Sequence, residues 1–267
     1  MIKSIATGLL ASVLWGGAFF GAYAALARAP SGNRDLAAGA TLEIAPAKTP
    51  AGGRVFIATV PLDAARWDLF LTPRDAAAPA DHELWTHRLA HTGTVASDNT
   101  LAVAINASMF KGGSWPIRRV GEIARATETT VAAGEVVRRW EHSYMLGFLS
   151  DLTPVPTPGK PPPPDMSAWR FGVSAQSWQG FDGKQAWWEQ GKLDRRTVVG
   201  VSTRTRTLFL GVVEHATLAS AADELMSRGA THVFNLDGGE SSTLTVNGHA
   251  LTGDWRPVAN HFGAKAK

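Results

Sequence analysis

The segment 235–243, Asn-Leu-Asp-Gly-Gly-Glu-Ser-Ser-Thr, brings together the residue types that a hydrolytic site needs. The carboxylate of Asp237 follows an apolar stretch and precedes two glycines, which allow a tight turn and a close approach of the backbone to a ligand. Ser241 and Ser242 add hydroxyl groups, and the backbone N–H groups of such a turn can face an anion. The alternative without chemistry is a tight turn stabilised by a hydrogen bond between Asp237 and the backbone.

Composition and motif content exclude several kinds of site. The chain contains no cysteine, which excludes disulfides, thiolate metal sites and a cysteine nucleophile. Its 26 basic and 23 acidic residues give a net charge of +3 without a basic block, which argues against a nucleic-acid-binding protein. The segment 239–243 lacks the second glycine of a serine nucleophile elbow. An esterase that uses Ser241 or Ser242 remains as a third hypothesis, and it predicts covalent labelling by a fluorophosphonate.

The elements around the Asp237 segment are predicted to place this carboxylate at the edge of a sheet. Residues 207–213 and 232–236 are predicted strands, and the apolar spacing over 218–226 predicts a helix between them. Thr217 is expected to cap the start of the helix and Gly229 to end it. A strand–helix–strand unit predicts parallel strands joined by a right-handed crossover, and ligands bind where the carboxyl ends of such strands meet.

Further strands are predicted upstream, and a hairpin is predicted downstream. The upstream strands are residues 55–60, 67–71 and 101–105, and the last is a continuous apolar run typical of a strand buried on both faces. Residues 242–251 form a predicted hairpin around Asn247-Gly248, a dipeptide that favours a type I′ turn. Together these elements predict an α/β (α+β) fold, with a mixed β-sheet and flanking helices.

Two other segments are predicted to lie at the surface. The proline-rich residues 154–164 favour extended polyproline II conformation and predict an exposed loop. Residues 81–91 are polar and carry His82, His87 and His91, and we expect a short exposed helix there. On such a helix the last two histidines would share a face and could bind a metal, but no carboxylate motif of a metalloprotease accompanies them.

The N-terminal residues predict export. A basic residue precedes the uncharged, apolar run 4–27, and Arg28 ends it. The small residues near its end fit a cleaved signal, whereas its length, which reaches the roughly 20 residues needed to span a bilayer, fits an uncleaved signal-anchor. Both hypotheses place the domain outside the cytoplasm, in the periplasm or secreted. We therefore divide the chain into a signal peptide or signal-anchor over 1–28, a tether with an entry strand over 29–53, and a single domain over 54–267.

Four segments, in the same order along the chain, resemble motifs of the phosphodiester glycosidase family. The segment 235–243 is similar to the family's Asn-Leu-Asp-Gly-Gly-Gly-Ser-Ser motif, with Glu240 in place of the third glycine. The other three are Ala-Ile-Asn-Ala-Ser-Met-Phe at 104–110, Arg-Thr-Val-Val-Gly at 196–200 and Arg-Pro-Val-Ala-Asn at 256–260. The resemblance spans about residues 95–263 and implies a domain that cleaves glycosyl phosphodiesters.

The resemblance implies a role for each matching residue. We expect Asp237 to be the essential carboxylate, and Glu240 to be either a second catalytic carboxylate or a solvated turn residue. Because the leaving group is a phosphate ester, neutralising its charge matters more than protonating it, and arginine can pair with two phosphate oxygens. We therefore expect Arg196 to hold the phosphate, with Arg195 or Arg256 behind it. The residues expected to bind substrate are Asn106, Arg196, Thr197, Gly238, Gly239, Ser241, Ser242, Arg256 and Asn260.

These inferences predict an exported glycoside hydrolase that cleaves a glycosyl-1-phosphodiester, or a related bond, in cell-envelope or extracellular glycans. Its substrate would be a carbohydrate or sugar phosphate, with no cofactor, no nucleic acid partner and membrane attachment only through the N-terminal segment. A divalent cation held by Asp237 with Asn106 or Glu240 is an alternative, because oxygen ligands suit calcium and magnesium. The alternative function is a non-catalytic protein of the same fold that binds glycans or assembles envelope polysaccharide.

Overall fold

The computed structural model describes residues 30–49, 51–77, 86–113, 117–140, 144–157, 159, 162–175, 177–185 and 191–267. The predicted export segment, His82 and part of the proline-rich segment lie outside the described residues. Residues 31–267 form one unit. Among the residues described, no helix is long and apolar enough to cross a membrane.

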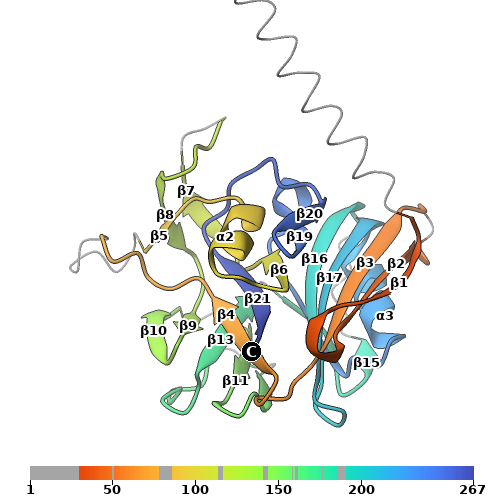
Figure 1. Cartoon of the computed structure of the whole chain (residues 1–267), viewed down its shortest axis with the longest axis horizontal. Helices are drawn as coiled ribbons and strands as arrows, with labels where there is room; N and C mark the ends of the chain where they lie inside the picture. Colours follow the sequence, from red (N-terminus) through yellow and green to blue (C-terminus); the bar gives the residue numbers. More distant parts are fainter. Residues whose placement is uncertain are drawn as a thin grey trace, which may run out of the picture. The chain divides into compact units, whose positions relative to one another are not determined.

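Four β-sheets contain most of the regular structure of the described residues (Figure 1). The eight-stranded sheet has the spatial order β1 (Gly32–Asp35), β2 (Thr41–Pro46), β3 (Arg54–Pro61), β17 (Thr207–Ala216), β16 (Asp194–Ser202), β18 (His232–Asn235), β14 (Ser177–Phe181) and β15 (Lys184–Gln185). A five-stranded sheet has the order β20 (His249–Thr252), β19 (Leu244–Val246), β6 (Val103–Asn106), β21 (His261–Ala266) and β4 (Trp67–Leu71).

The other two sheets are smaller and are formed by the middle of the chain. One has the order β10 (Glu135–Arg138), β9 (Thr130–Ala132), β13 (Phe171–Ala175), β11 (Tyr144–Phe148) and β12 (Pro154–Thr157). The other has the order β5 (His87–Arg88), β8 (Ile123–Ala126) and β7 (Phe110–Gly112). The helices of the described part are α2 (Thr92–Asp98), α3 (Leu218–Met226) and the short 3-10 turns η1 (Ala37–Gly39) and η2 (Gly239–Ser241).

The predicted α/β fold with a mixed sheet is wrong, because the pairs of neighbouring strands in the described sheets are antiparallel and the protein is mainly β. Strands β17 and β18 do run in the same direction on either side of α3, but β16 lies between them and pairs antiparallel with both. The turn 203–206 that joins β16 to β17 contains no glycine or proline, and Arg206 adopts its positive φ of 49°. The sequence therefore carries no usual signal for this hairpin.

Several local predictions are confirmed. Strands β3 and β4 occupy the expected positions, and α3 begins at a capping box in which Thr217 and Ser220 exchange hydrogen bonds. The β19–β20 hairpin turns at Asn247 and Gly248, whose φ angles of 49° and 78° fit a type I′ turn. Each of these features depends on residues close together in sequence.

The segment 29–53, which we expected to be a tether with an entry strand, contributes β1 and β2 to the eight-stranded sheet over its described residues. Two other local predictions are wrong. Pro154–Thr157 form the edge strand β12 rather than a loop, a position where proline's lack of an N–H group is tolerated. The expected helix 81–91 is also wrong over its described residues, because His87–Arg88 form strand β5 and the following helix starts only at Thr92.

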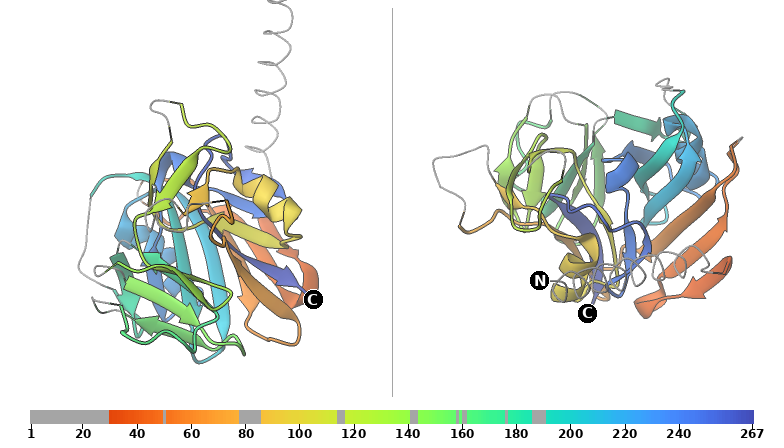
Figure 2. Two further views of the ribbon diagram at one scale, coloured as in Figure 1. Left: turned by 90° about the vertical axis from the view of Figure 1, so that its left-hand side faces the viewer. Right: turned by 90° about the horizontal axis from the view of Figure 1, so that it is seen from above.

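Helix α3 packs on one face of the eight-stranded sheet and forms an apolar core with it (Figure 2). Its buried Ala221, Ala222 and Leu225 contact apolar side chains of β3, β16, β17 and β18. Gly200 and Gly211 permit this close approach, since a Cβ on either residue would lie 3.0–3.1 Å from Leu225. The packing fixes the direction of β18 and thereby the position of the 235–243 segment that follows it.

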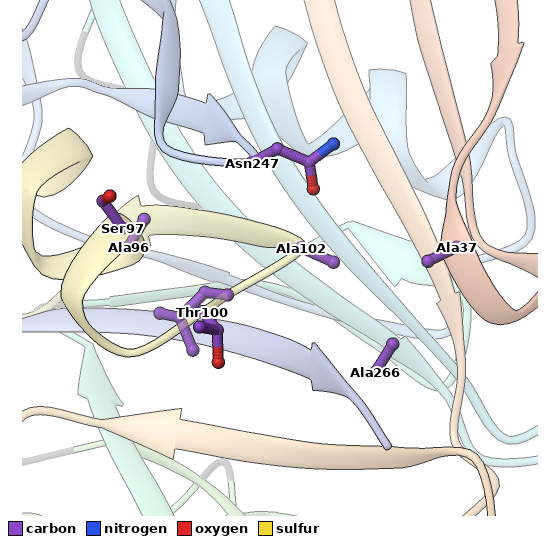
Figure 3. A pocket seen from close by; sticks show the side chains of 8 residues that line it. Ala37, Ala96, Ser97, Thr100, Ala102, Asn247 and Ala266 are labelled. Carbon is purple, nitrogen blue, oxygen red and sulfur yellow. The ribbon is translucent and has the colours of Figure 1, made fainter.

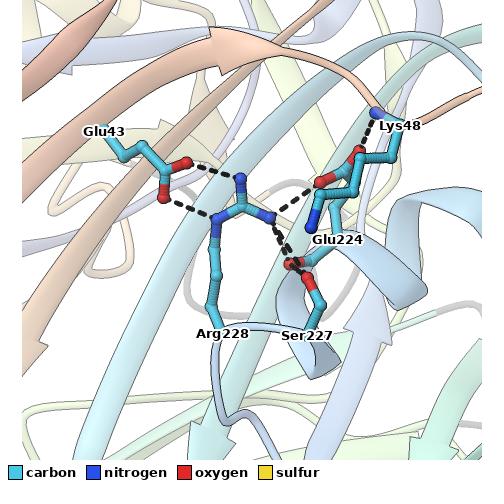
Figure 4. Close-up of polar contacts among 5 residues, drawn as sticks. All are labelled: Glu43, Lys48, Glu224, Ser227 and Arg228. Atoms are coloured by element: carbon cyan, nitrogen blue, oxygen red, sulfur yellow. Dashed lines mark hydrogen bonds and ion pairs between the residues drawn. The ribbon is translucent and has the colours of Figure 1, made fainter.

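An ion-pair network attaches the strand β2 to the end of α3 (Figure 4). Arg228 donates to both carboxylate oxygens of Glu43 at 2.6 Å and to the Glu224 carboxylate at 2.7 Å. The second carboxylate oxygen of Glu224 accepts a hydrogen bond from the backbone N–H of Lys48. The hydrogen bond from Arg228 lowers the pKa of Glu43. Glu224 is 2% exposed, so its charge depends on these partners.

We predict that Arg228→Met destabilises the protein by about 3–5 kcal/mol, because it leaves the buried Glu224 carboxylate without its cation. The matched control is Arg206→Met, since Arg206 pairs with Asp151 at 3.7 Å while both side chains are substantially exposed. That control is expected to cost about 1 kcal/mol or less. Urea unfolding of the two variants measures the difference, and equal losses of stability would contradict the assigned role of Arg228.

Candidate active site

Asp237 lies in a tight turn just beyond the C-terminal end of strand β18, where the strands of the eight-stranded sheet end. The backbone N–H of Asp237 donates to the carbonyl of Ala107 at 3.0 Å, which joins this turn to the end of β6. Gly239 adopts a φ of 64° and starts the 3-10 turn η2. Gly238 faces the main chain of β16, where a Cβ would lie 3.1 Å from the carbonyl oxygen of Arg195. The two glycines therefore serve the turn in different ways, one by its φ angle and one by the space it leaves.

The buried side chain of Asn106 holds this turn to three other parts of the chain. Its Nδ2 donates to the Asp237 carbonyl at 2.6 Å. Its Oδ1 accepts from the Thr197 hydroxyl at 2.8 Å and from the backbone N–H of Thr243 at 3.0 Å. The amide thus connects β6, β16, the Asp237 turn and the start of β19. Because protein donors occupy its oxygen, the geometry favours a role for Asn106 in orienting the Asp237 turn over its predicted contact with substrate.

The carboxyl group of Asp237 lies in a partly buried and electrostatically mixed environment. Burial raises its pKa, while the Ser241 hydroxyl and the positive charges of Arg256 and Arg118 oppose that rise. Ser241 itself is 1% exposed. A carboxylate with a raised pKa beside cations is a frequent feature of catalytic sites.

Two arginines, Arg256 and Arg118, interact electrostatically with the carboxylate of Asp237, and both also lie near the carboxylate of Glu240. Arg256 Nη1 is 3.5 Å from a carboxylate oxygen of Glu240, whose side chain is 66% exposed. The guanidinium of Arg118 lies 4.4 Å from the centre of the Phe110 ring, and burial together with the charge of Arg256 lowers its pKa. The site therefore contains two guanidinium groups and two carboxylate groups close together.

Arg118 is a site residue that the sequence analysis missed. It belongs to none of the four resembling segments, and its approach to Asp237 depends on the three-stranded sheet that carries its loop. The only sequence signal is the basic pair Arg118-Arg119, a few residues after the segment that contains Asn106.

Arg196 does not lie where a phosphate could reach it easily. It is 8% exposed, and its Nε and Nη2 donate to the carbonyls of Ala216 at 3.2 Å and Lys192 at 2.6 Å. Its guanidinium lies behind Gly238, where a Cβ would stand 3.9 Å from Nη1. Arg196 therefore holds the ends of β16 and β17 together, and backbone carbonyls occupy its Nε and Nη2 donors.

Two more of the residues that we expected to bind substrate, Ser242 and Asn260, differ in their hydrogen bonding. Ser242 donates to the carbonyl of Arg195 at 3.2 Å, which fixes the end of the turn. Asn260 is 1% exposed, and neither end of its amide has a hydrogen-bond partner among the described residues. Its own carbonyl accepts from the backbone N–H of Ala107, the residue whose carbonyl binds the N–H of Asp237. The Asn260 side chain is therefore a buried polar group close to the site that a ligand or water can satisfy.

Two other features bear on ligand binding. Among the described residues, no group of three histidine, aspartate or glutamate side chains is arranged to hold a metal ion. A pocket of about 300 Å³, lined by small and polar side chains such as Ser97 and Asn247, lies at the other end of β6 (Figure 3). Ala102, which precedes this strand, lines the pocket, whereas Asn106 at the end of the strand contacts the Asp237 turn.

The fold is similar to the fold of a solved enzyme structure. The catalytic domain of zebrafish N-acetylglucosamine-1-phosphodiester alpha-N-acetylglucosaminidase, in a form auto-inhibited by its pro-peptide, is similar with a TM-score of 0.64 and 16% sequence identity. The match covers 90% of this chain and 85% of that one. A protein from Synechocystis has a TM-score of 0.55 and 16% identity, over 85% of this chain and 62% of that chain. A search of curated proteins finds no match.

A comparison with protein-family models gives a more specific result than the similarity of folds. The family model described as phosphodiester glycosidase matches residues 99–265, which is more than half of the chain. This range contains Asn106, Arg118, Asp237, Arg256 and Asn260, the residues that the geometry brings to the same turn or its neighbours. The chain belongs to the phosphodiester glycosidase family.

Proposed function

We propose that this protein hydrolyses a glycosyl phosphodiester, with Asp237 as its essential carboxylate. The observation that carries the proposal is the approach of Arg256 and Arg118 to a partly buried carboxylate at the edge of a sheet. Glycosyl transfer to water passes through a state with positive charge at the anomeric carbon, which a neighbouring carboxylate stabilises. A phosphodiester brings a negative charge, which the two guanidinium groups neutralise.

The reaction breaks the bond between the anomeric carbon and the bridging phosphate oxygen. The phosphate monoester leaves with the bonding electron pair, and the oxygen of a water molecule forms the new bond to carbon while one of its protons is released. Asp237 stabilises the charge at carbon, and Arg256 with Arg118 stabilises the charge that accumulates on phosphate. The contact between Arg256 and Glu240 is long at 3.5 Å and exposed, so a substrate phosphate can replace Glu240 as the partner of Arg256.

The sugar is proposed to bind against Asn260 and Ser241. Both are 1% exposed; the Asn260 amide has no hydrogen-bond partner among the described residues, and the Ser241 hydroxyl faces the Asp237 carboxyl group. Buried polar groups are usually satisfied, so these two are suited to sugar hydroxyls, which can both donate and accept. The named activity of the zebrafish relative makes an N-acetylglucosamine phosphodiester the first substrate to examine.

The cellular location is proposed from the sequence. The uncharged run 4–27 followed by Arg28 has the composition of an export signal or signal-anchor. An exported enzyme of this kind would act on sugar phosphodiesters of cell-envelope or extracellular glycans.

A non-catalytic glycan-binding protein is the second candidate, and one observation favours it. Glu240 stands where the family motif has glycine, and its carboxylate contacts Arg256, the residue proposed to bind phosphate. If that contact persisted with ligand bound, it would weaken phosphate binding and catalysis. Turnover by the parent protein separates the two candidates, because the enzyme cleaves a glycosyl phosphodiester with Glu240 in place, whereas the binding protein does not cleave it unless Glu240→Gly releases Arg256.

We predict that Asp237→Asn lowers kcat on a glycosyl phosphodiester by about 10²–10⁴-fold while the fold is retained. The loss follows from removing the charge that stabilises the anomeric carbon. Product release from N-acetylglucosamine phosphodiesters, with circular dichroism as the folding control, measures it. The matched control is Asp98→Asn, an exposed carboxylate at the end of α2, which is expected to leave kcat unchanged. Full activity of Asp237→Asn would contradict the proposal.

The pH profile tests which arginine acts on Asp237. Because the charge of Arg256 opposes the rise in the pKa of Asp237, Arg256→Gln should raise that pKa further. Activity requires the ionised carboxylate and is lost as the pH falls through its pKa, so the acid limb of kcat/KM moves to higher pH in this variant. Its kcat/KM should also fall by roughly 100-fold or more.

The comparison variant is Arg196→Gln, which removes a buried cation held by backbone carbonyls. It should lower the stability to urea without moving the acid limb. A shift of the limb in Arg196→Gln together with an unchanged limb in Arg256→Gln would reverse the assignment of the phosphate clamp.

A further inference from the structure

We propose that Trp255 and Arg195 form a second carbohydrate subsite beside Asp237, which receives the glycan attached to the far side of the phosphate. This inference rests on the proposed function and extends it by naming the leaving-group side as a recognised carbohydrate. Four structural features lead to it: the rigid segment that carries Trp255, the exposure of its indole, the convergence of two donors, and the position of both residues beside the Asp237 turn.

The segment 253–256 is held firmly at its first two residues. The carboxylate of Asp254 accepts hydrogen bonds from the backbone N–H groups of Thr92 and Gly93, both at 2.8 Å. The Gly253 carbonyl accepts from the Thr243 hydroxyl at 2.6 Å. The next two residues are Trp255 and Arg256, so the same anchor positions the indole and the guanidinium that is proposed to bind phosphate.

The large side chain of Trp255 is exposed to solvent. It is 47% exposed, and among the described residues its indole N–H has no hydrogen-bond partner. Tryptophan combines a large apolar face with one polar edge, and a side chain of this kind stabilises an interface strongly when a ligand covers it. A sugar ring presents an apolar face of C–H groups and a rim of hydroxyls, which matches both parts of the indole.

Arg195 supplies a second donor next to the indole. Gly253 has no side chain, and a Cβ there would lie 2.7 Å from Arg195 Nη1 and 3.2 Å from Trp255 Nε1. The guanidinium and the indole edge therefore lie over the same glycine, and their N–H groups converge on a small region. No described residue forms a hydrogen bond or ion pair with the Arg195 side chain, so its donors are available to sugar hydroxyls.

Both residues border the candidate active site. The backbone carbonyl of Arg195 accepts from Ser242 at 3.2 Å, and it faces Gly238 across the turn. Trp255 directly precedes Arg256, which lies within the electrostatic reach of Asp237. Because Trp255 adjoins Arg256 in the chain and Arg195 borders the Asp237 turn, we assign to this surface the substituent of the phosphate that is opposite the sugar. The group on Trp255 is for this reason the leaving-group side of the phosphodiester.

The test compares two substrates that share a glycosyl phosphate and differ in the leaving group, one carrying a methyl group and one a trisaccharide. We expect the parent protein to have a higher kcat/KM for the trisaccharide, and Trp255→Ala to reduce this preference about 10-fold. Trp255→Phe, which keeps an aromatic face, should restore part of it. The matched control is Trp140→Ala, because Trp140 is 46% exposed and also lies beside an arginine, Arg138, whose guanidinium is 5.4 Å from its ring.

Binding provides the second measurement. Titration calorimetry of the free trisaccharide with Asp237→Asn should show an affinity about 10-fold higher than with the double variant Asp237→Asn/Trp255→Ala. Equal affinities, or an unchanged substrate preference in Trp255→Ala, would overturn the subsite while leaving the proposed function intact. Failure of the parent to cleave either substrate would instead overturn the proposed function, and saturable trisaccharide binding that depends on Trp255 would then assign the subsite to a glycan-binding protein.

Discussion

The hydrogen bonds of one buried amide, Asn106, determine whether this protein has a site at all. The amide holds the Asp237 carbonyl, the Thr197 hydroxyl and the Thr243 N–H at 2.6–3.0 Å. These groups belong to β16, to the turn that follows β18, and to Thr243, which directly precedes β19 in another sheet. Since a buried amide that loses its partners costs about 1–3 kcal/mol for each group left unsatisfied, the arrangement has little freedom to relax. The turn that carries the carboxylate is therefore a rigid part of the sheet junction.

The charged side chains around that turn set the ionisation of Asp237. Burial raises the pKa of Asp237, and Arg256 and Arg118 limit the rise by favouring the ionised form. The two carboxylates and two guanidinium groups carry equal and opposite formal charges. In the proposed reaction the phosphodiester adds a negative charge, and the exposed Glu240 can release Arg256 to it. Arg196, the most buried of these arginines, joins strand ends through its hydrogen bonds to backbone carbonyls. The division separates the positive charge that holds the fold from the positive charge available to a substrate.

The sequence predicts the local features of this structure well and the long-range ones poorly. The Asn247-Gly248 turn, the Thr217 cap of α3 and the glycine-containing turn after Asp237 depend on neighbouring residues, whose conformational preferences are visible in the chain. The fold class was beyond this reasoning because β16 enters between β17 and β18 through a turn without glycine or proline. The approach of Arg118 to Asp237, and the hydrogen bonds of Arg196 to backbone carbonyls, depend on contacts between distant segments, which spacing alone does not reveal.

Hydrogen exchange in Asn106→Ala tests the central claim most directly. If the amide holds the turn, the backbone amides of residues 237–243 should lose protection by about 10-fold or more, while those of α3 and β17 keep theirs. Asn106→Asp offers a companion variant, since it keeps the acceptor for Thr197 and Thr243 but loses the donor to the Asp237 carbonyl. Unchanged protection of residues 237–243 in Asn106→Ala would show that the turn is held by other contacts and would contradict the account.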